Sequence, residues 1–121
     1  MGMIEKTWAQ HFAAEWIAAW NAHNLERVLS HYSDDFEMRS PLIVELMGVA
    51  SGTLKGKGAI RPYWEKGLAA HPSLQFELHC VLIGVDSIAI YYRSTPKSRM
   101  VAEVLTFRDD GQIVSGAALY A

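Results

Sequence analysis

Apolar side chains recur every four residues at the start of the chain, at Ile4, Trp8, Phe12, Trp16 and Trp20. Residues four apart lie on one side of an α-helix, so this spacing predicts a helix of about five turns with one broad apolar face. Asn24 then offers an N-cap for a second, short helix. A third helix is predicted from about Gly58 to Ala70, where apolar residues again repeat at intervals of four: Ile60, Trp64 and Leu68.

The period changes to two where strands are predicted. The stretch "DDFEMRSPLI" alternates Phe36, Met38 and Ser40 on one side and stops at Pro41. From Ser73 onward alternation resumes, and the turns "GVDS", "STPKS" and "DDG" divide the remainder into four strands. The second half of the chain therefore predicts a four-stranded antiparallel meander.

Helices grouped before such a meander predict an α+β domain rather than alternating βαβ units. We expect one domain over residues 1–121, with three N-terminal helices packed on a curved, mainly antiparallel sheet that leaves a conical cavity. The segment 41–52 is apolar and broken by glycines, which suits a loop acting as a lid over the cavity mouth. Its apolar side chains are expected to contact a ligand or a second copy of the chain: Leu42, Ile43, Leu46 and Met47.

Composition narrows the classes of partner. The 121 residues hold 11 Lys and Arg against 13 Asp and Glu, without a run of like charges. This balance argues against binding to nucleic acid or to a membrane surface, and no apolar stretch approaches the roughly 20 residues of a membrane span. The single cysteine, Cys80, excludes an internal disulfide and favours a cytoplasmic setting. We expect a small molecule or a second copy of the chain as the partner.

Three strings carry a resemblance to a known family: A-W-N-x-x-[DN]-L at residues 19–25, D-F-x-x-x-S-P at 35–41 and G-x-x-x-G-x-x-A-I-R at 52–61. With the order of elements, they resemble the SnoaL-like branch of the NTF2-like superfamily, which includes polyketide cyclases and ketosteroid isomerase. The resemblance covers nearly the whole chain. It implies an NTF2-like (cystatin-like) cone with an apolar pocket, and a homodimer formed through the outer face of the sheet.

The isomerase chemistry of that superfamily does not carry over to this chain. The position of the general-base aspartate resembles Ser40, the oxyanion-binding tyrosine falls on Trp16, and the second, protonated acid falls on Leu105. Proton abstraction beside a carbonyl needs both a base and oxyanion stabilisation. All three departures argue against ketosteroid isomerisation.

Glu103 is the best remaining candidate for an acid or base. It stands two residues before Leu105 and therefore shares the face of the strand that should line the pocket. Burial in an apolar pocket would raise the pKa of its carboxyl toward neutrality. A salt bridge, for example to Arg39, or a hydrogen bond is the structural alternative. The residues expected to bind a ligand around Glu103 are Trp16, Trp20, Met38, Ser40, Met47, Trp64, Tyr92 and Leu105.

Two functional classes remain open from the sequence. One is a small enzyme in which Glu103 transfers a proton on a cyclic or polyketide-type hydrophobic substrate, as an isomerase, cyclase or hydrolase would. The other is a non-catalytic binder of a hydrophobic ligand, or a dimeric structural or adaptor domain. The five histidines and Cys80 lack metal-ligand spacing, so we expect no metal and no cofactor. Alternation places Gln75, Glu77, His79, Val81 and Ile83 on the outer face, where a two-fold dimer is expected.

Overall fold

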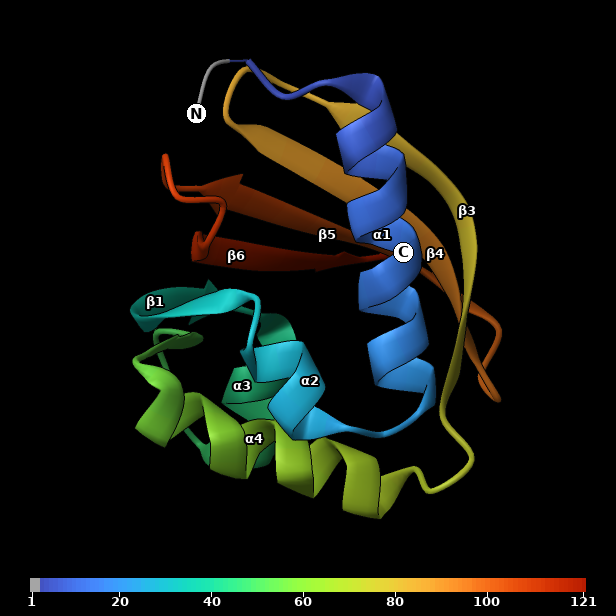
Figure 1. The fold of residues 1–121 in the computed structure, drawn as a ribbon. Helices are drawn as coiled ribbons and strands as arrows, with labels where there is room; N and C mark the ends of the chain where they lie inside the picture. The colour runs from blue at the N-terminus through green and yellow to red at the C-terminus, as the bar shows by residue number, and fades with distance from the viewer. Residues whose placement is uncertain (1–2) are drawn as a thin grey trace.

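The computed structural model describes residues 3–121 as helices packed against one face of a single sheet (Figure 1). The helices are α1 (Lys6–Asn21), α2 (Leu25–Leu29), α3 (Pro41–Met47) and α4 (Lys57–Ala70). The strands are β1 (Tyr32–Arg39), β2 (Thr53–Lys55), β3 (Gln75–Ile83), β4 (Ser87–Thr95), β5 (Arg99–Phe107) and β6 (Ile113–Tyr120). The predicted α+β architecture is confirmed.

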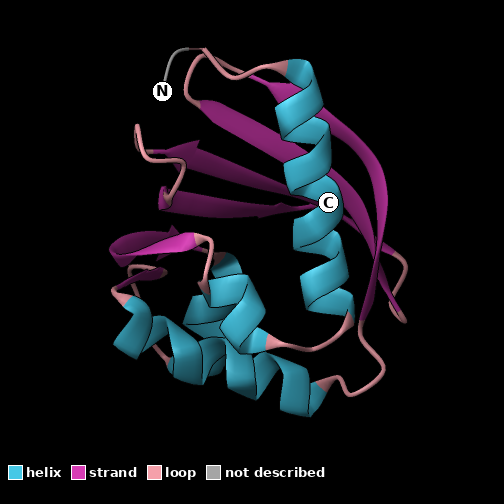
Figure 2. Cartoon of the chain, in the orientation of Figure 1, coloured by secondary structure: helices cyan, strands magenta, loops and turns pink. Residues whose placement is uncertain are grey.

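The sheet has the order β2-β1-β6-β5-β4-β3 and is antiparallel except between β1 and β6. Strands β3 to β6 form the predicted meander. The sheet curves, and α1 crosses its concave side while the other helices gather at one end (Figures 1 and 2). The buried residues form a core cluster between the sheet and the helices. No helix within residues 3–121 is long and apolar enough to cross a membrane.

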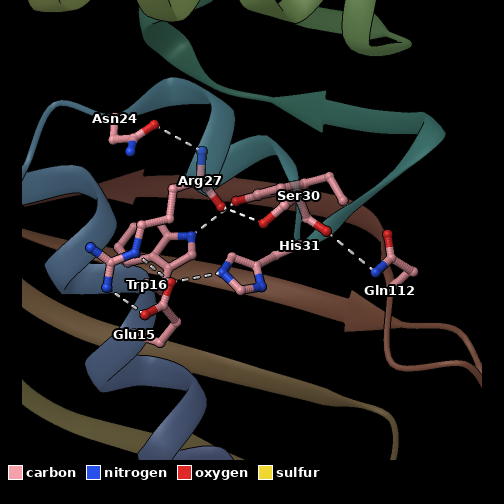
Figure 3. A network of polar contacts seen from close by, with 8 residues as sticks. Glu15, Trp16, Asn24, Arg27, Ser30, His31 and Gln112 are labelled. Carbon is pink, nitrogen blue, oxygen red and sulfur yellow. Dashed lines mark hydrogen bonds and ion pairs between the residues drawn. The ribbon is translucent and has the colours of Figure 1, made fainter.

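The junction between α1, α2 and β1 is held by a polar network around Glu15 (Figure 3). Asn24 caps α2 as predicted, since its Oδ1 accepts a hydrogen bond from the backbone N–H of Arg27. The Arg27 guanidinium donates two hydrogen bonds to Glu15, of 2.6 and 2.9 Å, and His31 Nε2 lies 3.1 Å from the same carboxylate. The Arg27 bonds, with His31 adding to them, lower the pKa of Glu15 to about 2. This network fixes where the chain leaves α1 and enters the sheet.

The segment 41–47 is a helix rather than the expected loop, so the described residues hold four helices instead of three. Ser40 caps α3, Pro41 occupies its first turn without losing a needed donor, and Gly48 ends it with a left-handed φ of 67°. The fully buried Ile43 anchors the helix, and burying such a side chain contributes about 1.5–3 kcal/mol. Short length hid this helix, because seven residues give too few turns for a clear period.

A register shift in β3 overturns the expected placement of Val81 and Ile83 on the outer face. The shift lies between Leu78 and Cys80, which pair with the adjacent residues Tyr92 and Tyr91. After it, Val81 pairs with the buried Ile90 and Ile83 with the buried Ile88. Directly paired residues share a face, so Val81 and Ile83 point toward the helices, and Leu82 points outward.

Candidate functional site

A cavity of about 320 Å³ lies between the concave face of the sheet and the helices. This volume is at the small end of the range for ligand sites, about 300–1,000 Å³. Every helix except α2 contributes to its wall, together with β1, β3, β4, β5, β6 and the turn between β4 and β5. The side chains from the helices are Trp16, Trp20, Leu42, Glu45, Leu46, Tyr63, Trp64 and Leu68.

Aromatic rings make up much of the cavity wall. Phe76 of β3 packs against Tyr92 of β4 with ring centroids 4.3 Å apart, and it stacks on Trp16 at 5.8 Å. Trp20 meets Trp64 edge to face at 5.0 Å. Because each ring is supported by another, the wall presents flat apolar surfaces in fixed orientations, which suit an aromatic or cyclic ligand.

Glu103 is the buried carboxyl of this cavity and is only 7 % exposed. It lies in the middle of β5 opposite Ile90 of β4 and Ala118 of β6. Tyr92 donates a hydrogen bond of 3.2 Å to its Oε1. No Lys, Arg or His within residues 3–121 forms an ion pair with it, and Arg39, the partner considered from the sequence, is exposed and lines a separate shallow groove.

Burial without a compensating cation raises the pKa of Glu103 from 4.5 to about 7, against the smaller lowering effect of the Tyr92 hydrogen bond. The charged form loses its hydration inside the aromatic wall, and one phenol replaces only part of it. At pH 7 comparable fractions of Glu103 therefore carry and lack a proton. A carboxyl in this state can both accept and return a proton.

Two further tyrosines, Tyr63 and Tyr120, line the same cavity. Desolvation is the largest cause of their raised pKa values; that of Tyr63 rises to about 12. Both phenols therefore keep their protons at neutral pH and act as hydrogen-bond donors. The Tyr63 hydroxyl donates to Ser40 Oγ over 3.2 Å, and the charge of Glu103 also acts on both phenols.

Ser40 serves the backbone rather than the cavity. Its Oγ accepts a hydrogen bond from the N–H of Leu42 at 3.2 Å, which caps α3, and a second one from Tyr63. The side chain is buried and lies outside the cavity wall, although its partner Tyr63 belongs to that wall. Ser40 also borders a separate shallow groove formed by residues of β1, α3 and β6. The position that resembles the isomerase base thus holds a helix cap.

The two indole groups of α1 that line the cavity differ in the state of their N–H donors. Trp16 Nε1 donates to the hydroxyl of Tyr32 over 3.0 Å, so this donor is engaged within the protein. Trp20 Nε1 is buried and has no hydrogen-bond partner among the described residues. An unsatisfied buried donor costs about 1–3 kcal/mol, and an acceptor atom of a bound ligand would recover part of that cost.

The structure brings together six of the nine residues proposed from the sequence. Glu103 and five of its expected neighbours line the cavity: Trp16, Trp20, Met38, Trp64 and Tyr92. Three proposed residues lie outside the lining: Ser40, Met47 and Leu105. Leu105 is fully buried in the hydrophobic core, and Met47 of α3 is partly buried and packs against that core. Within residues 3–121, no three His, Cys, Asp or Glu side chains converge in the way a metal site requires.

Sequence reasoning missed several wall residues. Tyr63 stands three residues after Ile60 and shares its side of α4, so helical spacing could have found it. Alternation along β5 could have found Val101, two residues before Glu103. The same alternation reaches Arg99, the first residue of β5. No local pattern assigns the turn residues Pro96 and Lys97 to the cavity, because the packing of the β4–β5 turn against the helices decides it.

Residues 13–116 match the SnoaL-like domain. The chain belongs to the SnoaL-like family. Its structure is similar to that of a SnoaL-like protein of unknown function from Burkholderia thailandensis, with 48 % sequence identity, 98 % of each chain covered and a TM-score of 0.94. No curated protein matches the sequence.

Two solved structures of lower sequence identity share the fold. The structure of IdmH from Streptomyces antibioticus, a candidate polyketide cyclase, has 16 % identity over 93 % of this chain and 91 % of that chain, with a TM-score of 0.75. An NTF2-like protein of unknown function from Cytophaga hutchinsonii has 13 % identity over 93 % and 89 % of the two chains, with a TM-score of 0.67. These likenesses confirm the predicted NTF2-like fold.

Proposed function

We propose that this SnoaL-like protein binds an apolar cyclic small molecule in the cavity and that Glu103 transfers a proton on it. The observation that carries the proposal is one buried carboxyl, without a cation, inside an aromatic wall. Ionising such a carboxyl costs folding free energy. A carboxyl with a pKa shifted in this way, inside a cavity, is therefore a candidate functional group. Candidate polyketide cyclase activity in the IdmH relative is consistent with such a substrate.

The chemistry follows from the positions of the donors. In its ionised form Glu103 would remove a proton from a substrate carbon next to a carbonyl, and in its protonated form it would return that proton to another atom. The phenol of Tyr120 stays protonated and would donate a hydrogen bond to the carbonyl oxygen as negative charge develops there; Tyr63 would do the same only after its hydroxyl leaves Ser40 Oγ. Tyr92 holds the carboxyl in place.

Binding without catalysis is the second candidate function, and specific observations favour it. The positions that resemble the isomerase base and the two oxyanion donors hold Ser40, Trp16 and Leu105, and the structure engages the first two elsewhere. In that case Glu103 and the unpaired Trp20 N–H would only orient a ligand.

Replacement of Glu103 by Gln separates the two candidates. Glu103→Gln keeps the shape and the acceptor for Tyr92 while it removes proton transfer. A molecule that co-purifies with the protein, identified by native mass spectrometry, supplies the compound to test. Catalysis predicts that the variant binds this compound but turns it over on the order of 100-fold more slowly. Equal turnover by variant and wild type would exclude Glu103 as the acid or base, and absence of any turnover by the wild type would favour the binder.

A further inference from the structure

The opening of the cavity is marked by the exposed members of its lining, Glu45, Pro96, Lys97 and Arg99. Two of the four are permanent cations, both from the region of the β4–β5 turn, and one is an anion from α3 on the opposite wall. The half-buried His71 at the end of α4 adds a further polar group. The charged side chains at the opening therefore comprise two cations and one anion, whereas the interior is aromatic.

Neither cation is neutralised by a carboxylate side chain. Lys97 forms no ion pair with any described residue, and the same is true of Arg99 and of Glu45. The Arg99 guanidinium instead lies over the ring of Tyr120, 4.5 Å from its centroid, and its Nε donates to the carbonyl oxygen of Ala121. The ring of Tyr120, itself part of the cavity wall, thus fixes Arg99 at the edge of the opening.

Arg99 and Glu103 also lie on the same face of one strand. Arg99 is the first residue of β5, and residues 99, 101 and 103 point to the same side because side chains alternate along a strand. Their Cα atoms are four residues apart, which corresponds to roughly 13 Å along the strand. The two groups therefore stand apart on one inner face of β5, with Arg99 at the opening and Glu103 inside the cavity.

From this arrangement we propose that the ligand is an apolar ring compound with an anionic group, such as a carboxylate, at one end and an oxygen substituent at the other. The anion binds at the opening to Lys97 and Arg99, the rings lie among Trp20, Trp64 and Phe76, and the far oxygen meets Glu103 and the phenols. The inference rests on the proposed function of the cavity and adds to it the charge and orientation of the ligand.

Matched acids and esters test the charge of the ligand. The probes are 6-hydroxy-2-naphthoate and anthracene-2-carboxylate, each compared with its uncharged methyl ester, and quenching of the cavity tryptophans reports their binding. We expect each acid to bind the wild-type protein roughly three- to tenfold more tightly than its ester, since each partly exposed ion pair contributes modestly. Raising the salt concentration should weaken the acids but not the esters.

Variants then locate the anion site. Lys97→Gln and Arg99→Gln should each reduce the preference for the acid, and together they should abolish it while ester binding stays unchanged. Lys55→Gln is the matched control, because Lys55 is an exposed lysine of β2 outside the cavity. Circular dichroism confirms that each variant is folded.

The outcomes distinguish this inference from the function on which it rests. Equal binding of acids and esters, or an equal loss in the Lys55 variant, would overturn the anionic ligand and leave the binding cavity intact. If neither acids nor esters bind the wild-type protein, the aromatic cavity does not bind ring compounds. That result would exclude both the proposed binding function and this inference.

Discussion

The Tyr92 hydroxyl donates a hydrogen bond to Glu103 Oε1 across two neighbouring strands, over 3.2 Å, with both side chains buried. The register of β4 and β5 pairs Tyr92 with Val101 and Glu103 with Ile90, so the two residues are diagonal neighbours on the inner face. The sheet itself therefore places a donor beside the carboxyl. The sheet supplies one phenol and no cation to this carboxyl, so the pKa of Glu103 lies at about 7.

The raised pKa of Glu103 predicts a stability that falls as the pH rises. In the unfolded chain the carboxyl ionises near 4.5, but in the folded protein it ionises near 7, so the folded state holds the extra proton between these values. Stability should decline across this window by up to about 3 kcal/mol. Glu103→Gln removes the decline, and its Tm should exceed that of the wild type by several degrees at pH 8, with a smaller difference at pH 4.

Thermal unfolding followed by circular dichroism at a series of pH values checks this expectation. Glu77→Gln changes an exposed carboxyl on β3 and should retain the decline of the wild type. A Tm difference between wild type and Glu103→Gln that does not depend on pH would contradict the raised pKa.

Tyr92→Phe should raise the pKa of Glu103 further, because it removes the hydrogen bond that lowers this pKa. The lost bond should also reduce the free energy of unfolding by about 1 kcal/mol. Carbon-detected NMR of the glutamate carboxyls measures the shift directly. Tyr91→Phe is the matched control, since Tyr91 pairs with Cys80 and Ala102 on the outer face; an equal shift in both variants would argue against a specific bond.

Ser40→Ala should destabilise the protein by about 1–2 kcal/mol, since it removes the cap of α3 and the acceptor of Tyr63. Urea unfolding measures the loss. Ser73→Ala, at an exposed serine before β3, should change the free energy of unfolding by less than about 0.5 kcal/mol. A Ser40→Ala protein as stable as the wild type would show that the cap is dispensable.

Ser40→Asp should fold, because aspartate also caps helices, and should remain nearly inactive on ketosteroids. An acid at this position restores the base of the isomerases that the sequence resembles, but Leu105 supplies no donor and the Trp16 N–H is bonded to Tyr32. Absorbance of the conjugated ketone product follows the reaction. Strong isomerisation by this variant would show that other groups of the cavity stabilise the oxyanion.

We propose a two-fold dimer through the outer face of the sheet, with a different set of side chains from that expected from the sequence. Leu82 and Leu119 point outward and are 62 % and 52 % exposed, and the smaller Ala102 and Val104 lie on the same face between them. Burying such a patch between two copies would remove apolar surface from water. Sedimentation at micromolar concentration should show a dimer.

Leu82→Glu with Leu119→Glu should convert that dimer to a monomer. Val85→Glu introduces the same charge at an exposed apolar residue of the β3–β4 turn and should leave the dimer intact. A monomeric wild-type protein would remove the proposal.

The sequence by itself determined the class of fold and the inward direction of Glu103. The four-residue spacing of α1 and the two-residue spacing of β5 are local consequences of backbone geometry, and each places its apolar residues on one side regardless of what covers them. The side of β5 that bears Leu105 and Phe107 had to be buried. Glu103 shares that side, so its burial was readable from the strand alone.

Only the tertiary structure decided what surrounds that carboxyl. Val81 and Ile83 point inward because β3 pairs with β4 after a register shift. The apolar segment that begins at Pro41 is helical because Ser40 caps it and the buried Ile43 anchors it. Packing of α3, α4 and the β4–β5 turn around the sheet then brought Pro96 and Lys97 of that turn to the same cavity as the residues of α3 and α4. These contacts join residues far apart in the chain, so no local period records them; they depend on how curved surfaces fit together and on which polar groups find partners once water is excluded.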